Sequence, residues 1–123
     1  MPESKPRRIA EQYVEAWRKG DFDAQRRVLH DDLHFLGPFD TFKSADDFQA
    51  ALKRLAPMLK NVEVHRGWDD GDDVCFVYDL VTEGPIARTP CAEWIQVRGD
   101  KIGSIRVFFD ARPWAPMFEQ QQP

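Results

Sequence analysis

The carboxylate with the clearest capacity for chemistry stands at the end of the last apolar segment of the chain. Asp110 directly follows Phe108 and Phe109, and a turn begins close behind it at Pro113. An aspartate that leans back over an aromatic-lined concavity has a raised pKa and can act as a general acid or base. An aspartate in an exposed turn instead accepts hydrogen bonds from nearby backbone N–H groups and only ends the strand. The residues alone leave both interpretations open.

Two more carboxylates interrupt segments in which apolar residues alternate. Glu93 shares one side of its strand with Cys91 and Ile95 if the alternation of this strand is regular. A glutamate inside a strand is costly to bury without a partner. Glu93 therefore faces either water, which is the commoner case and the one that we favour, or a polar cavity. Asp79 lies on the side opposite to Tyr78, and the sequence does not tell which of the two sides lines a cavity.

The histidines and cysteines do not form a metal or redox signature. His30 and His34 are separated by an expected break between helix and strand, and His65 is far along the chain. Cys75 and Cys91 both fall inside expected strands, and we interpret them as reduced core thiols rather than as a disulfide. The chain also lacks a Gly-rich phosphate loop and a nucleophile elbow. We therefore predict neither a metal site nor a cofactor.

Length and composition limit the class of protein. The 123 residues suffice for one domain with one core, and the 42% of hydrophobic and 12% of aromatic residues argue against disorder. The formal net charge of −4 makes a nucleic-acid surface improbable. No apolar run approaches the roughly 18–20 residues of a membrane span, and no signal peptide is recognised at the N-terminus. We expect a cytoplasmic protein with no membrane and no nucleic-acid partner.

Periodicity changes from helical to strand-like along the chain. In chain order we expect a helix from about Pro6 to Lys19 ended by Gly20, a short helix capped by Asp21, a strand over 33–36, a helix from Ser44 to about Ala56, and strands over 62–68, 74–82, 88–97 and 102–109. Helices followed by an antiparallel meander indicate an α+β fold. We predict a single domain over 1–123, with a core at about 6–114 and a tail at 115–123.

The expected architecture is a strongly bent, mainly antiparallel sheet with the three N-terminal helices on one face. Phe48, Leu52 and Leu55 form the apolar stripe with which the third helix should pack against the sheet. Such a cone leaves an open mouth through which a small molecule can enter.

Three segments carry a resemblance to a known family. They are Tyr-Val-Glu-Ala-Trp-Arg-Lys-Gly-Asp-Phe at 13–22, Gly-Pro-Phe at 37–39 and Ile-Arg-Val-Phe-Phe-Asp at 105–110. From about Ile9 to Trp114 the chain resembles the SnoaL-like branch of the nuclear transport factor 2-like superfamily. That superfamily includes polyketide cyclases, ketosteroid isomerases and limonene epoxide hydrolases, and its cone also hosts binding proteins and assembly modules.

The resemblance implies roles for single residues. Asp110 matches the aspartate that ends the last strand in the polyketide cyclases and the epoxide hydrolases. Glu93 falls at a second acid of those hydrolases, whereas Cys91 replaces their arginine. Tyr13 matches the tyrosine with which ketosteroid isomerases bind a substrate oxyanion, but Gly37 replaces their general base. Each catalytic set is therefore incomplete, and steroid-type isomerisation in that form is not expected.

We therefore predict a cofactor-free acid/base enzyme, namely an isomerase, cyclase or hydrolase, for an apolar oxygenated substrate. The alternative is a non-catalytic ligand-binding or dimerisation module. Asp110 and Glu93 are the candidate catalytic residues. The candidate cavity residues are Tyr13, Trp17, His34, Phe39, Tyr78, Asp79, Ile95, Val107, Phe109 and Trp114. For Tyr13 and Trp17 a purely structural place in the core is the more frequent outcome.

We also predict a homodimer. A sheet with helices on one side leaves its other face uncovered. Large residues such as Trp68, Trp94 and Phe108 would be exposed on that face, as an apolar patch that is unusual for a monomer.

Overall fold

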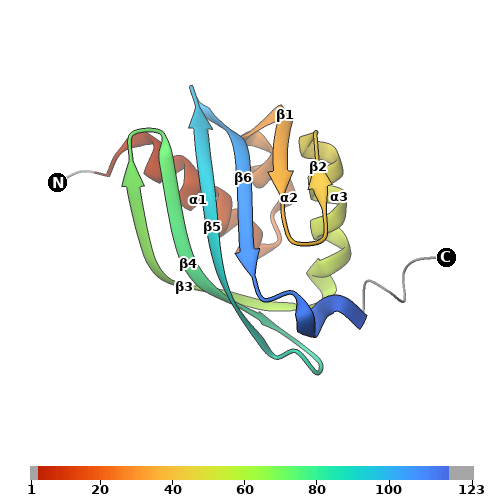
Figure 1. The fold of residues 1–123 in the computed structure, drawn as a ribbon. Coiled ribbons are helices and arrows are strands. Elements are labelled where there is room, and N and C mark those ends of the chain that lie inside the picture. Colours follow the sequence, from red (N-terminus) through yellow and green to blue (C-terminus); the bar gives the residue numbers. More distant parts are fainter. Residues whose placement is uncertain (1–2, 117–123) are drawn as a thin grey trace.

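The computed structural model describes residues 3–116 as helices packed on one face of a curved sheet (Figure 1). The elements are α1 (Lys5–Lys19), α2 (Phe22–Arg27), β1 (Leu29–Leu36), β2 (Thr41–Phe42), α3 (Ala45–Leu55), the 3₁₀ turn η1 (Ala56–Met58), β3 (Leu59–Asp70), β4 (Asp73–Thr82), β5 (Arg88–Arg98), β6 (Lys101–Phe109) and the 3₁₀ turn η2 (Arg112–Trp114). The α+β class is confirmed. Most of the predicted tail lies outside the described residues.

Local capping chemistry determines where the helices begin and end. The Asp21 side chain accepts a hydrogen bond from the Ala24 N–H, and the Ser44 hydroxyl accepts one from the Asp47 N–H. Gly20 ends α1 in the left-handed region at φ 71°, where glycine meets no steric cost. These three predictions are confirmed, because each depends only on neighbouring residues.

The sheet is mixed but mainly antiparallel, in the order β2-β1-β6-β5-β4-β3. Among the strands of residues 3–116, only β1 and β6 pair in parallel. Register shifts interrupt the β1–β6, β3–β4 and β5–β6 pairings, and such bulges bend and twist strands locally. Figure 1 shows β3, β4 and β5 curving around the helices. The strand β2 was not predicted, since two residues are too few to show a period.

Aromatic residues from the helices and the sheet meet in the core. Phe48 of α3 is buried and its ring stacks on Phe35 at 4.7 Å and on Tyr13 at 6.4 Å between centroids. Leu52 and Leu55 are partly buried against the same core. The prediction that α3 packs on the sheet through this stripe is confirmed.

The opposite face of the sheet carries a row of aromatic and basic side chains. Trp68 is 50% exposed and Phe108 is 55% exposed, whereas Trp94 is half-buried and donates its Nε1–H to Asp73 at 2.9 Å. The Arg66 guanidinium lies 5.2 Å from the centre of the Trp68 ring, and the Arg106 guanidinium lies 5.2 Å from the centre of the Trp94 ring. We call this row, formed by Arg66, Trp68, Trp94, Arg106 and Phe108, the outer patch. Its use as a dimer interface stays a prediction.

Between residues 3 and 116, no helix combines the length and the apolar character needed to cross a membrane.

Candidate functional site

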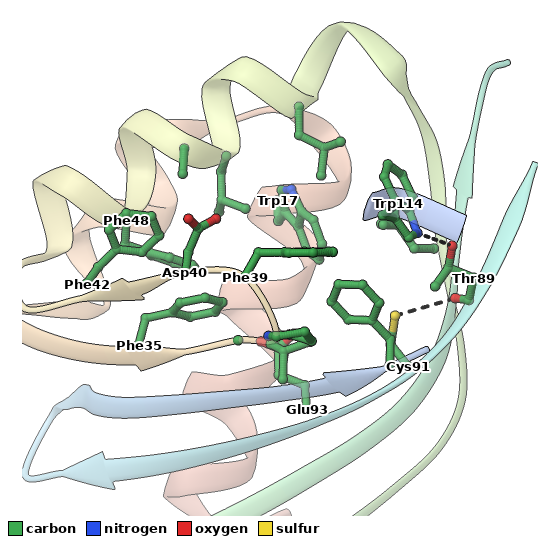
Figure 2. Close-up of a pocket in the computed structure, with 18 of the residues that line it drawn as sticks. Trp17, Phe35, Phe39, Asp40, Phe42, Phe48, Thr89, Cys91, Glu93 and Trp114 are labelled. Carbon is green, nitrogen blue, oxygen red and sulfur yellow. Dashed lines mark hydrogen bonds between the residues drawn. The ribbon is translucent and has the colours of Figure 1, made fainter. Parts of the chain in front are cut away.

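A pocket of about 280 Å³ lies between the helices and the concave face of the sheet (Figure 2). Most of its lining is aromatic or aliphatic, and it comes from α1, α3 and the strands β1, β2, β4, β5 and β6 together with the turns that flank them. Tyr13 and Trp17 come from α1, Phe48 from α3, Tyr78 from β4 and Phe109 from β6. The volume is slightly below the range of pockets for drug-sized ligands, so the pocket suits a small apolar molecule.

Glu93 is a buried acid on the sheet side of this pocket. Its residue exposure is 1%, and β5 holds it opposite Phe76 of β4 and Val107 of β6. The Tyr78 hydroxyl donates a hydrogen bond to Glu93 Oε1 at 2.7 Å, while Oε2 has no partner among residues 3–116. The interpretation that Glu93 faces water is therefore wrong. The alternation itself was correct, since Cys91 and Ile95 are buried on the same side.

Burial controls the protonation of this cluster. It raises the pKa of Glu93, and the hydrogen bond from Tyr78 followed by the influence of Tyr13 only partly offsets this effect. Only the Tyr78 bond has full hydrogen-bond geometry. Burial and the neighbouring Glu93 charge also hold the pKa of both tyrosines well above the ordinary value, so both remain hydrogen-bond donors at neutral pH. The cluster therefore favours a neutral carboxyl that shares its pocket with neutral hydroxyl groups.

The pocket lining contains two more polar groups, the Cys91 thiol and the Trp17 indole N–H. Burial raises the pKa of the Cys91 thiol to about 12, with a smaller effect from Glu93, so this cysteine is not a thiolate nucleophile at neutral pH. The Trp17 indole is buried in the lining, and its Nε1–H has no acceptor among residues 3–116. Within that part of the chain, no three His, Cys, Asp or Glu side chains gather where they could hold a metal ion.

Asp40 also lines the pocket, and the sequence analysis did not identify it. It lies in the loop between β1 and β2, where its backbone carbonyl accepts a hydrogen bond from the Gly37 N–H at 2.9 Å. A Cβ at position 37 would lie only 3.0 Å from the Phe35 ring, so glycine lets this loop pack closely over the pocket. Figure 2 shows Asp40 among the side chains around the pocket. The available signal was a carboxylate just after the Gly-Pro stop of a strand.

Asp110 is not part of the pocket lining. Its side chain is 53% exposed, and its carboxylate accepts hydrogen bonds from the Arg112 backbone N–H at 3.1 Å and from the Arg112 guanidinium at 2.9 and 2.7 Å. The guanidinium and then the backbone N–H of Arg112 lower the pKa of Asp110 to about 2. The expectation of a raised pKa over an aromatic concavity is wrong. The partner of Asp110 is an arginine of the turn itself.

Three more expected cavity residues lie elsewhere. His34 is exposed on β1, and Ile95 is fully buried in the core outside the pocket lining. Asp79 is on the opposite face of β4, where it accepts a hydrogen bond from Arg88 at 2.9 Å and pairs with His65 at 3.3 Å. Alternation placed Asp79 opposite to Tyr78 correctly, but it could not tell which side the helices cover. The structure places the other cavity candidates at the pocket, namely Tyr13, Trp17, Phe39, Tyr78, Val107, Phe109 and Trp114.

Comparisons with known proteins agree with this architecture. The model of the SnoaL-like domain family matches residues 10–105. No match was found among curated proteins. A structure of a nuclear transport factor 2-like protein from Cytophaga hutchinsonii superposes with a TM-score of 0.81 at 22% identity, over 93% of this chain and 97% of that one.

Two other similar structures are described by their chemistry or fold. An epoxide hydrolase from M. tuberculosis that resembles limonene epoxide hydrolases gives a TM-score of 0.76 at 21% identity, over 94% of this chain and 90% of that one. A protein from Catenulispora acidiphila with a ketosteroid isomerase-like fold, in complex with trimethylamine, gives 0.69 at 21% identity, over 83% and 85%. At these identities the likeness shows the fold alone.

Proposed function

The chain belongs to the SnoaL-like domain family, and we propose that it is a cofactor-free acid/base enzyme for a small apolar molecule that carries an oxygen. The observation that carries this proposal is Glu93, a buried carboxyl with one oxygen bound by Tyr78 and the other without a partner among residues 3–116. A buried acid whose pKa is raised in an otherwise apolar pocket is a typical mark of a functional site.

Glu93 would serve as the acid. In its neutral form the proton lies on Oε2, because Oε1 already accepts the Tyr78 hydrogen bond. That proton can be donated to a carbonyl or ether oxygen of the substrate, and such a donor stabilises negative charge as it develops on the oxygen. The aromatic lining supplies the apolar contact that brings the substrate to this donor.

Asp40 would serve as the base. With a ketone in the pocket, the Asp40 carboxylate removes a proton from the carbon next to the carbonyl. The electron pair of the broken C–H bond forms the C=C bond of an enol, and the carbonyl oxygen takes up the Glu93 proton. If the ketone is β,γ-unsaturated, the intermediate is a dienol, and return of the proton from Asp40 to its γ carbon, while the enol O–H proton goes back to Glu93, gives the conjugated isomer. If the substrate carries a second carbonyl, the enol carbon attacks that carbonyl carbon to close a ring, the new alkoxide takes the proton from Asp40, and the enol O–H proton goes back to Glu93. Each step balances without a cofactor.

A second candidate is a binding protein without turnover. Asp110, the expected acid or base, lies outside the pocket and is paired with Arg112. If Asp40 does not reach the bound molecule, the pocket retains one buried acid, and this suffices for recognition of an oxygen but not for proton transfer between two carbons.

Exchange of hydrogen for deuterium at the carbon next to a carbonyl separates these candidates. A panel of small cyclic ketones is incubated with the protein in deuterated buffer, and exchange is followed by NMR together with binding. We expect exchange with the wild type, loss of exchange with binding retained in Asp40→Asn, and exchange at least 100-fold slower in Glu93→Gln, the usual scale of acid/base catalysis. Asp79→Asn, a matched carboxylate on the outer face, should leave exchange unchanged.

Binding without exchange in the wild type would support the binding protein instead. Failure of every ketone to bind, or equal binding by Glu93→Leu, would contradict recognition of an oxygen by Glu93.

A further inference from the structure

We propose that Trp114 is the residue that sets the length of ligand that the pocket accepts. This inference rests on the proposed function only in taking the pocket as the binding site. Figure 2 shows Trp114 at one end of the pocket and Phe42 and Phe48 at the other, with Glu93 between them on the sheet side. In this arrangement the Trp114 ring is an end wall.

The wall is built by a reversal of the chain directly after β6. The Asp110 carboxylate accepts a hydrogen bond from the Arg112 backbone N–H at 3.1 Å and pairs with the Arg112 guanidinium at 2.7 Å. The Trp114 N–H then donates to the Ala111 carbonyl at 3.0 Å, and this closes the 3₁₀ turn η2. Asp110 thus has a structural use: its turn directs the following segment back over the pocket.

One buried hydrogen bond fastens this segment to the sheet. Trp114 is 5% exposed, and its Nε1–H donates to the Thr89 hydroxyl oxygen at 3.0 Å. Thr89 is 4% exposed at the beginning of β5, and its backbone carbonyl accepts a hydrogen bond from the Cys91 thiol at 3.4 Å. Both bonds are drawn in Figure 2. The indole therefore has its N–H fixed at the sheet while its ring faces the pocket.

The rest of the segment is held weakly. Arg112 and Asp110 are exposed, so their ion pair is screened by solvent and adds little to stability. Retention of the wall depends mainly on the Trp114 ring and on its bond to Thr89. Substitutions can therefore either remove the wall or weaken its attachment to the sheet. Trp114→Ala removes the wall, Thr89→Val keeps a side chain of the same shape and removes only the bond that fastens the wall, and Trp114→Phe removes the bond and leaves a smaller aromatic ring.

The test measures affinity against ligand length. Cyclohexanones with a 4-alkyl chain of increasing length, and the matched alkylcyclohexanes that lack the oxygen, compete with a fluorescent apolar probe. Each methylene that enters an apolar pocket should raise the affinity about fourfold. For the wild type we expect this rise to stop once the chain reaches Trp114. For Trp114→Ala the rise should continue over further methylenes.

Thr89→Val and Trp114→Phe should both lie between these two, with the longest chains bound about two- to tenfold more tightly than by the wild type, and Trp114→Phe should extend the limit at least as far as Thr89→Val because its ring is smaller. Trp68→Ala removes an exposed tryptophan on the outer patch and should leave the wild-type limit unchanged. If Trp114→Ala does not fold, the two conservative variants decide. The same limiting length in the wild type and in Thr89→Val and Trp114→Phe would overturn the inference.

The two series of ligands keep the two proposals apart. If ketones and hydrocarbons bind equally, yet both show a length limit that the Trp114 variants shift, the wall exists and the role of Glu93 is wrong. If ketones bind better through Glu93 but no variant shifts the limit, the proposed function stands and the inference is wrong.

Discussion

Glu93 on β5 and Asp110 after β6 are single carboxylates among apolar residues of two neighbouring strands. Glu93 pairs in register with Val107, three residues before Asp110. One of the two acids is buried, has a pKa raised by that burial and is bound by a tyrosine, while the other is exposed, has a pKa lowered to about 2 and is bound by an arginine. The difference arises because Glu93 stands inside a regular strand beneath the helices, whereas Asp110 stands where the chain turns away. Apolar neighbours in sequence do not make an apolar environment.

Replacing each of the two acids with lysine should give the largest difference in stability between the two positions. Glu93→Lys would put an ammonium group at a buried site beside the Tyr78 hydroxyl, and the free energy of unfolding should fall by about 3–5 kcal/mol. Asp110→Lys removes an exposed pair with Arg112 that solvent screens, so this variant should stay folded and lose much less stability than Glu93→Lys. Urea denaturation of both variants checks this. Equal stability of the two variants would contradict the buried position of Glu93.

Much of the fold could be predicted because its signals are local. The caps Asp21 and Ser44 act on backbone groups three residues away, and β4 and β5 alternate with a period of two along their whole length. By contrast, β2 exists through its pairing with β1, in which Phe42 lies opposite Phe35, and no pattern within two residues can reveal that contact.

The site was predictable only in part, because its chemistry depends on which side of the sheet the helices cover. Alternation grouped Glu93 with its neighbours correctly but gave the same pattern for an inward and an outward face. Asp40 lies in a loop, where no period exists. The partner of Asp110 was missed because side chains two positions apart in a regular strand share a face but stand about 7 Å apart, and Arg112 comes within hydrogen-bond distance only because the chain turns.

The comparison extends to the two faces of the sheet, and the outer patch provides the second test. We expect the wild type to be a dimer at micromolar concentration, since exposed Trp68 and Phe108 form an apolar surface on the uncovered face. The double substitution Trp68→Asp with Phe108→Asp should weaken association by about 100-fold or more, through burial of charge at the interface. Light scattering should then report only the 14.3 kDa species.

Gln12→Asp, which adds a charge to an exposed position of α1, is the matched control and should remain dimeric. A wild type that scatters only as the 14.3 kDa species would contradict the dimer.

The smallest expected effect is the pH dependence of stability, which should have opposite signs at the two acids. Burial raises the pKa of Glu93 above 4.5, so the folded state holds this proton more tightly than the unfolded state. Stability due to the neutral carboxyl is then fully present below about 4.5 and is lost as the pH rises through the folded pKa. The glutamine side chain of the Glu93→Gln variant cannot ionise, so the stability of this variant relative to the wild type should increase as the pH rises through the folded pKa of Glu93.

Asp110 has the opposite sign. Its pKa is lowered from 3.8 to about 2, so its contribution is present above 3.8 and disappears as the pH falls to about 2. The group is exposed, so the contribution is slight, and Asp110→Asn should be slightly less stable than the wild type above that window and equal to it below. Denaturation curves for both variants and the wild type across these pH ranges provide the measurement. A Glu93→Gln advantage that stays constant from acid to neutral pH would mean that Glu93 is not held neutral by burial, and the acid of the proposed reaction would then have to be found elsewhere in the pocket.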